Sequence, residues 1–258
     1  MNRAAAAREG SLLGLLPVAG GRSDSIGSFP AGKPLVIAID GTSGSGKSTT
    51  ARAVARALSG SYVDTGAMYR AVAWWILRQG VDLSDPAAIA TAAGDAHVIV
   101  QPNPASFAVV CNGFDVTQQV RKVAVTEAVS TVAAVPAVRA MLCSYQRTLA
   151  DDALTAGRAM VMEGRDIGTV VLPEADVKIW LTADVEARAA RRAGDGEGPV
   201  SETSARLVNR DQIDATRAVS PAQMAADAIH IDTTSTSVDE VVARVLELAT
   251  TVRLADQR

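Results

Sequence analysis

The sequence predicts a three-layer α/β/α fold, in which helices cover both faces of a parallel sheet of about five strands. Apolar runs of strand length alternate with longer helical patterns, and this alternation is typical of a parallel sheet. The first apolar run, residues 35–40, leads into a glycine-rich segment and then into a helical stretch. Polar and charged residues follow several apolar runs, at the strand ends where such sheets bind ligands.

The first part of the chain contains two strand–helix pairs and then a different pattern. In residues 81–121, short strand-like segments are separated by the turn signals Pro102-Asn103-Pro104 and Asn112-Gly113. We therefore expect a small β-rich insertion there. The two pairs before it are a strand at 35–40 with a helix at 47–58, and a strand at 61–66 with a helix at 68–78.

The second part of the chain returns to the alternating pattern. Residues 123–155 are helical, and Pro136 marks the start of the second of two helices, since proline favours the first helical turn. Ser237 and Glu240 form a capping-box pattern before the last helix. The other expected elements are strands within 158–166, 177–181 and 227–232, helices at 184–192 and 202–217, and a glycine-rich link at 194–199.

Residues 41–48, GTSGSGKS, match the phosphate-loop pattern G-x-x-x-x-G-K-[ST] between a strand and a helix. Its glycines permit backbone conformations that turn N–H groups toward an anion, and the helix N-terminus adds partial positive charge. Lys47 can reach the β- and γ-phosphates, and the Ser48 hydroxyl can ligate magnesium. We expect a P-loop NTPase that holds a nucleoside triphosphate with Gly41, Thr42, Ser43, Gly44, Ser45, Gly46, Lys47, Ser48 and Thr49.

Composition narrows the function further. The formal net charge of −3 argues against a general nucleic-acid binder, which normally carries a basic face. Two cysteines and two histidines are too few for a Cys/His zinc site or a disulfide framework. The apolar run at 11–21 is too short to span a membrane and only slightly resembles a signal-peptide core, so we expect residues 1–32 to be a disordered extension. These features favour a cytoplasmic protein without membrane or nucleic-acid partners.

Three polar clusters lie at strand ends or in the loops that follow. Arginine is frequent in them, and its planar guanidinium binds phosphate bidentately. Because they accompany a phosphate loop, they predict a second substrate whose phosphate faces the γ-phosphate. The clusters are DTGAMYR at 64–70, EGRDIGT at 163–169 and RDQIDATR at 210–217, the last preceded by Arg188, Arg191 and Arg192.

Four segments resemble bacterial cytidylate kinases: VDTGAMYR, STVAAVPAVR, MEGRDIGTVVLPEADVKIWL and RDQIDATRAVSP. The resemblance is collinear from about residue 36 to about residue 249 and includes the β-rich insertion. It implies an enzyme that transfers the γ-phosphoryl group of ATP to CMP or dCMP, with Mg²⁺ bound through ATP and Ser48. It also implies a monomer whose partners are these nucleotides.

The resemblance also implies roles for individual residues. Ser130, Arg139 and Asp166 would face the cytosine ring, and Thr65 and Arg70 would contact the phosphate and ribose region. The implied CMP site comprises Thr65, Tyr69, Arg70, Ser130, Arg139, Gly164, Arg165, Asp166, Arg210, Asp214 and Arg217. The implied catalytic group comprises Lys47, Arg165 and Arg217, with Arg188 and Arg192 closing from a lid.

The resemblance divides a domain at 33–255 into a core, an acceptor-binding insertion and a lid. The lid link is short for the family, so the resemblance leaves open which of Arg188, Arg191 and Arg192 reaches the phosphates. Glu163 stands where relatives often carry aspartate. The expected parts are a core at 33–80, 122–192 and 203–252, an insertion at about 81–121 and a lid at about 193–202.

The choice of acceptor rests on Asp166. Cytosine presents an N4 amine where uracil presents an O4 acceptor, and a carboxylate favours the amine. Two alternatives stay open at this point. One is a kinase of another acceptor, such as UMP or a small metabolite like shikimate. The other is a GTP-binding switch, but such proteins usually carry an N-K-x-D motif, and no lysine in this chain follows an asparagine.

Overall fold

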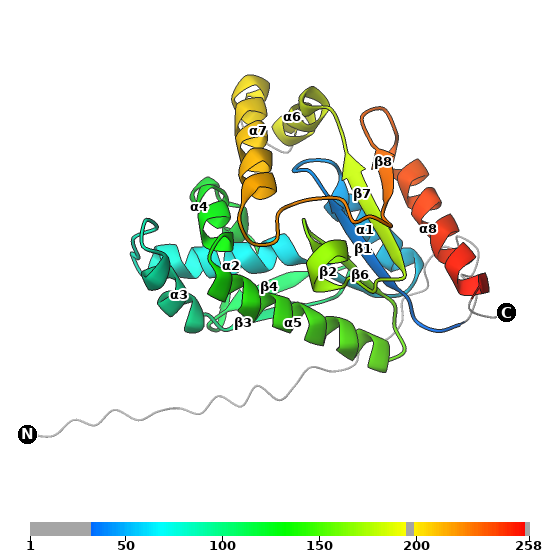
Figure 1. Ribbon diagram of the computed structural model, residues 1–258, viewed down its shortest axis with the longest axis horizontal. Helices are drawn as coiled ribbons and strands as arrows, with labels where there is room; N and C mark the ends of the chain where they lie inside the picture. The colour runs from blue at the N-terminus through cyan, green and yellow to red at the C-terminus, as the bar shows by residue number, and fades with distance from the viewer. Residues whose placement is uncertain (1–31, 195–198, 256–258) are drawn as a thin grey trace, which may run out of the picture.

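The computed structural model describes residues 32–194 and 199–255. Its main sheet has five parallel strands in the spatial order β2-β6-β1-β7-β8, and helices cover both faces (Figure 1). This confirms the predicted fold class. The expected extension, apart from Gly32, and residues 195–198 of the expected lid lie outside the described residues. The strands are β1 (Val36–Gly41), β2 (Ser61–Asp64), β6 (Met160–Glu163), β7 (Val177–Thr182) and β8 (Ile229–Asp232).

Burial on both faces explains why the central strand is apolar along most of its length. All six residues of β1 are buried. Ile37 and Ile39 belong to a cluster formed with α1 (Lys47–Ala57) and α8 (Val238–Ala255), whereas Val36 and Ala38 belong to a second cluster. Since successive side chains of a strand point to opposite faces, this one strand contributes to both hydrophobic layers.

The second cluster is covered by several helices and a small antiparallel sheet, β3-β4-β5. The two helices expected at 123–155 are present, and the second begins at Pro136 as predicted. The elements of this layer are α2 (Thr65–Arg78), α4 (Val123–Ala133), α5 (Pro136–Thr155), β3 (Val98–Gln101), β4 (Ala108–Cys111) and β5 (Phe114–Asp115).

The insertion differs from its expected pattern in two places. Residues 86–94 form a helix, α3 (Pro86–Gly94), whose start is fixed by the Asp85 carboxylate, an acceptor for the N–H of Ala87 at 2.9 Å. The last strand-like segment pairs only at β5, and a short 3-10 turn, η1 (Gln119–Arg121), follows. Alternation of apolar residues does not show where a strand stops pairing with its neighbour. The prediction from sequence therefore contained more strand than the structure has.

Helix α2 begins earlier than the expected Met68. The carboxylate of Asp64 accepts the N–H of Ala67 at 2.8 Å and so caps the helix at Thr65. A side-chain oxygen at this position satisfies one of the free N–H groups of the first turn. The consequence is that Thr65 and Arg70 lie close to the carboxyl end of β2, next to the phosphate loop.

The C-terminal half adds two helices near the carboxyl edge of the sheet. Helices α6 (Val185–Gly194) and α7 (Val200–Thr216) pack against each other and stand above the strands in Figure 1. The capping box before α8 is confirmed, because Ser237 N donates to Glu240 Oε2 at 2.8 Å and Glu240 N donates to Ser237 Oγ at 3.3 Å.

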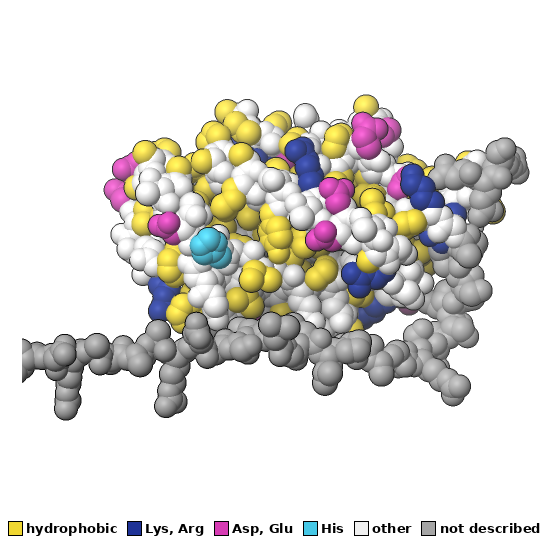
Figure 2. Space-filling view, turned by 90° about the horizontal axis from the view of Figure 1, so that it is seen from below, with side chains coloured by type: hydrophobic (Ala, Val, Ile, Leu, Met, Phe, Trp, Pro, Cys, Tyr) yellow, Lys and Arg dark blue, Asp and Glu magenta, His cyan; other side chains and the backbone are white. Residues whose placement is uncertain are grey.

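Within the described ranges, no single helix is long and apolar enough to cross a membrane. Helices α4 and α5 meet the length and hydropathy requirement only as a pair, and the chain bends by 99° between them. Figure 2 shows the molecule from below, where lysine and arginine side chains are scattered rather than gathered.

We expect Gly41→Ala to destabilise the protein strongly. An added Cβ would lie 1.9 Å from the carbonyl oxygen of Leu181, and Gly41 has a φ of 144°. Either β1 must separate from β7 or the backbone must change conformation, at a cost above about 2 kcal/mol. Gly113→Ala is a matched control, since Gly113 also has positive φ but nothing lies within 4 Å of its added Cβ. It should cost about 1–2 kcal/mol. Chemical denaturation measures both, and equal losses would contradict the steric argument.

Candidate active site

The phosphate loop joins β1 to α1 at the carboxyl edge of the sheet. Gly44 and Gly46 adopt left-handed conformations, with φ of 79° and 89°. Thr42 N donates to the carbonyl of Leu181 at 3.2 Å, which fixes the start of the loop against β7. The Lys47 ammonium donates to the carbonyl of Thr42 at 2.6 Å. The loop therefore has the glycine conformations and the buried lysine that a phosphate-binding turn requires.

Side chains from later in the chain hold the loop from outside. Arg188 donates to the carbonyl of Ser43 at 2.9 Å and also pairs with Asp211, whose carboxylate accepts the N–H of Ser43 at 3.0 Å. Thr233, directly after β8, donates to the carbonyl of Ser45 at 3.0 Å. Helices α6 and α7 and the end of β8 thus fix the loop through its own backbone groups.

A cavity of about 1230 Å³ lies in front of the loop. Among the described residues, ten arginines and two lysines line it, against four carboxylates. The cavity therefore has a strong excess of positive charge and suits a polyanionic ligand. Its charged residues are Lys47, Arg52, Arg56, Arg70, Arg121, Lys122, Arg139, Arg165, Arg191, Arg192, Arg210 and Arg217, with Asp64, Glu163, Asp166 and Asp214.

One wall of the cavity is organised by Asp166. Its carboxylate pairs with Arg139 and lies 3.7 Å from a guanidinium nitrogen of Arg217. The Arg139 guanidinium also lies over the ring of Tyr69, 5.3 Å from its centroid. Burial lowers the pKa of Arg139, but Asp166 and Tyr69, with a smaller part from Cys143, together outweigh it and leave that pKa above its usual value. This wall combines an aromatic face, a carboxylate and two cations, which can recognise a flat polar ring.

Two further ion pairs line the cavity. Arg165 donates to Asp214 at 3.1 Å, and Arg70 donates to Asp64 at 3.2 Å. Asp64 also caps α2, so its position is fixed independently of Arg70. Long arginine side chains otherwise extend into solvent. The two ion pairs keep these guanidinium groups at the cavity instead.

Glu163 lies at the end of β6, beside Asp64 on the neighbouring strand. It accepts a hydrogen bond from the Tyr62 hydroxyl at 2.9 Å. Burial, followed by the charge of Asp64, raises the pKa of Glu163, while Lys47 opposes the rise. Thr65 donates to the carbonyl of Glu163 at 2.7 Å and ties the two strand ends together.

The crowding of cations lowers several pKa values. Burial and then the charge of Arg165 hold the pKa of Lys47 well below its usual range. The same two causes lower the pKa of Arg210 to about 9. Burial and then Arg139 lower the pKa of Arg217. A bound anion would favour the charged form of each group, so these shifts fit a phosphate site.

Five buried guanidinium nitrogens in the cavity lack a hydrogen-bond partner within the part of the chain that the structure describes. Buried donors are rarely left unpaired, and such groups are free to bind a ligand oxygen. They are Arg52 Nε, Arg70 Nε, Arg139 Nε, Arg210 Nε and Arg217 Nη2.

Most of the residues expected from sequence line this one cavity. Four of them do not. Gly41, Thr42 and Ser45 shape the loop from behind, and Arg188 is buried against it. Those that do line the cavity are Ser43, Gly44, Gly46, Lys47, Ser48, Thr49, Thr65, Tyr69, Arg70, Ser130, Arg139, Gly164, Arg165, Asp166, Arg192, Arg210, Asp214 and Arg217.

The position of Arg188 differs from the expected lid role. Its guanidinium donates to the carbonyls of Ala183 and Ser43, both at 2.9 Å, and pairs with Asp211. These contacts hold Arg188 against the backbone of the loop, and it does not line the cavity. Arg191 and Arg192, one turn later on α6, line the cavity instead. All three lie on one side of the helix by their spacing, so what separates their roles is the part of the structure that lies opposite each of them.

Sequence reasoning missed several residues of the site. Both Asp211 and Thr233 bind the loop and are far from it in sequence: Asp211 was quoted within RDQIDATR without a role, and Thr233 belongs to no motif. Thr233 could have been found as the polar residue directly after the last strand. Asp64 was quoted in a motif without a role, and the structure gives it two: the cap of α2 and the pair with Arg70.

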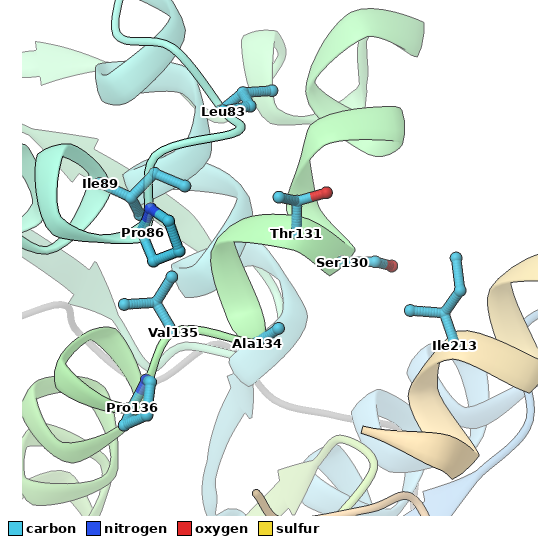
Figure 3. Close-up of a pocket in the computed structure, with 9 residues that line it drawn as sticks. All are labelled: Leu83, Pro86, Ile89, Ser130, Thr131, Ala134, Val135, Pro136 and Ile213. Carbon is cyan, nitrogen blue, oxygen red and sulfur yellow. The ribbon is translucent and has the colours of Figure 1, made fainter. Parts of the chain in front are cut away.

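A second, smaller pocket of about 480 Å³ lies beside the main cavity. Ser130 lines both, so the two are separated only by the wall that α4 provides. Figure 3 shows Ile213 of α7 facing Ser130 across the open side of this pocket. Its lining is mainly apolar: Leu83, Pro86, Ile89, Ser130, Thr131, Ala134, Val135, Pro136 and Ile213.

Comparison with known proteins agrees with this geometry. The cytidylate kinase family model matches residues 37–251. A cytidylate kinase of Streptomyces avermitilis is 46% identical over 222 residues, which cover 86% of this chain and 95% of the relative. A cytidylate kinase of Rhodococcus opacus is 50% identical over 217 residues, which cover 82% of this chain and 93% of the relative. One of Geobacillus thermodenitrificans is 45% identical over 219 residues, or 83% and 96%. The chain therefore belongs to the cytidylate kinase family.

Proposed function

We propose that this protein phosphorylates CMP and dCMP with ATP, giving ADP and CDP or dCDP. The observation that carries the proposal is that the phosphate loop and the Asp166 wall line one continuous, strongly basic cavity. A donor triphosphate and an acceptor monophosphate therefore fit face to face. Family membership supports both the reaction and the use of ATP.

The donor half would hold the ATP phosphates through the loop N–H groups, Lys47 and the N-terminus of α1. Phosphoryl transfer needs little covalent chemistry from the protein, since its task is to align the reacting oxygens and to balance negative charge. Lys47, Arg165 and Arg217 line the cavity and would do this, and Arg192 would approach from α6. The acceptor phosphate is already anionic, so no general base is required.

The residues near Ser48 fit a magnesium ion that arrives with ATP. Glu163 and Asp64 add carboxylate oxygens to the Ser48 hydroxyl at the same end of the cavity. No group of three or more His, Cys, Asp or Glu able to hold a metal occurs in the described segments. This matches magnesium, which takes one or two protein ligands and completes its shell with phosphate and water. When bound, the ion would balance charge on the β- and γ-phosphates.

The acceptor half would read the base through Asp166. Its carboxylate can accept from the cytosine N4 amine while Arg139 and Arg217 hold it in place. The O4 of uracil would face the same carboxylate and be repelled. Arg70 and Arg210 would bind the monophosphate, and Asp214 would accept from the ribose. A monomeric state and a cytoplasmic location remain predictions that rest on the family resemblance.

The test of the proposed function is a coupled ADP-release assay with ATP and magnesium, using CMP, dCMP, UMP, AMP and shikimate as acceptors. We expect CMP and dCMP to be phosphorylated with the highest kcat/KM. If none of the acceptors increases ADP release above the level with ATP alone, the kinase assignment is wrong. A higher kcat/KM with UMP or shikimate would assign the protein to another acceptor.

We expect Lys47→Ala to lower kcat by about 10²- to 10³-fold, the loss typical for a preorganised group that stabilises transition-state charge. Lys47 is buried beside the phosphate loop. Lys33→Ala is the matched control, because Lys33 is exposed and outside the cavity, and its kcat should stay at the wild-type value. Steady-state kinetics with saturating CMP measure both. An unchanged kcat in Lys47→Ala would contradict the role of this lysine.

We expect Asp166→Asn to reduce the preference for CMP over UMP by about 10- to 100-fold, the discrimination that a good base contact supplies. The comparison variant is Asp214→Asn, which should weaken both acceptors equally, because Asp214 is placed for the ribose. Ratios of kcat/KM for the two nucleotides provide the measurement. An unchanged ratio in Asp166→Asn would remove this carboxylate from base recognition.

A further inference from the structure

Asp40 is a buried carboxylate that the proposed mechanism does not use. It precedes Gly41 at the end of β1 and is only 4% exposed. Its two oxygens accept backbone N–H groups from another segment: Oδ1 from Ile167 at 2.9 Å and Oδ2 from Gly168 at 2.8 Å. Asp40 does not line the cavity. It therefore touches neither half of the site directly, but it connects the strand of the donor half to a turn of the acceptor half.

The turn that Asp40 binds begins directly after Asp166. It is η2 (Ile167–Val171), a single π-helical turn, and Asp166 occupies its N-cap position. An aspartate at an N-cap normally accepts an N–H of the first turn with its own side chain. Asp166 makes no such hydrogen bond. Its carboxylate meets Arg139 and Arg217 instead.

We propose that Asp40 is a positioning residue, which caps η2 from the neighbouring strand and so leaves the Asp166 carboxylate directed at Arg139, Arg217 and the acceptor base. The inference rests on the proposed function, because it assigns the base to Asp166. Asp166 alone could not both accept the N–H groups of the turn and face the cavity. With Asp40 accepting those N–H groups, the Asp166 carboxylate can face the cavity.

The packing around the turn supports this role. An added Cβ at Gly168 would lie 3.2 Å from the Lys178 side chain and 3.6 Å from Asp40 Oδ2, so the turn is seated closely on β1 and β7. Burial raises the pKa of Asp40 to about 6, with the two N–H groups opposing the rise, Asp166 adding to it and Lys47 opposing it. Burial makes it costly in free energy to keep the Asp40 carboxylate charged. The two hydrogen bonds from Ile167 and Gly168 give this charge a function that a neutral side chain would not perform.

The test is the variant Asp40→Asn, which keeps the size of the side chain but turns an NH₂ group toward one of the two N–H groups. We expect the KM for CMP to rise about tenfold or more, as for a lost hydrogen bond to a charged group. The preference for CMP over UMP should fall with it. The KM for ATP should stay within about twofold, because the contacts of Asp40 are to η2 and not to the loop.

Asp176→Asn is the matched control. Asp176 Oδ2 accepts the N–H of Val36 at 2.7 Å, so it makes the same kind of contact at the opposite end of β1. This variant should lose thermal stability without changing either KM. If Asp40→Asn also loses only stability, or if it raises the KM for ATP as much as that for CMP, the positioning role is wrong.

A double-variant experiment tests whether Asp40 acts through Asp166. Residues that act as a unit give non-additive effects. We therefore expect Asp40→Asn to cause no further loss of base preference in the Asp166→Asn background. Full additivity would overturn the proposal. Failure of wild-type protein to use CMP would instead contradict the proposed function, and the two failures are thus distinguishable.

If the Asp40 variants do not fold, a second measurement that leaves Asp40 unchanged still tests the proposal. Amide hydrogen exchange in Asp166→Ala, which removes any capping oxygen at position 166, reports on Ile167 and Gly168 without altering their proposed cap. We expect both amides to stay as protected as in the wild type. Loss of their protection would show that Asp166 itself caps the turn, and would overturn the proposal.

Discussion

The crowding of positive charge around one cavity is the physical constraint on which the rest of the structure depends. Among the described residues, twelve cationic side chains and four carboxylates line the cavity. Burial, together with this crowding, lowers the pKa values of Lys47, Arg210 and Arg217. Ion pairs fix several of these cations before a ligand binds, since Asp64, Asp166 and Asp214 pair with Arg70, Arg139 and Arg165. A polyanion bound there would meet a preorganised set of donors, which is the condition for electrostatic catalysis.

The carboxylates of the site divide into those that face the cavity and those that hold the backbone. Asp166 and Asp214 pair with arginines across the cavity. Asp211 and Asp40 bind backbone N–H groups of the phosphate loop and of η2. Asp64 does both, since it caps α2 and pairs with Arg70. This division lets the loops keep defined conformations although they carry few apolar side chains.

The donor and acceptor halves are joined through the sheet itself. Strand β1 leads into the phosphate loop, and the adjacent strand β6 leads into the turn with Arg165 and Asp166. Their parallel pairing places both loops at one edge, as the general rule for such sheets predicts. The bond from Thr65 to Glu163 and the bonds from Ile167 and Gly168 to Asp40 then fix the loops to one another. A shift of one loop would therefore move the other.

The sequence by itself predicted the fold class and the phosphate loop, because strand periodicity, glycine conformation and short motifs are written in neighbouring residues. The expected residues of the acceptor half came from the resemblance of four segments to a known family. Tertiary structure alone decided which arginine of α6 faces the cavity, since Arg188 and Arg192 look alike in sequence and differ only in what lies opposite. It also decided the roles of Asp40, Asp211 and Thr233, whose partners are distant in the chain. A hydrogen bond depends on distance and direction in space, and a single sequence does not contain them for residues that folding brings together.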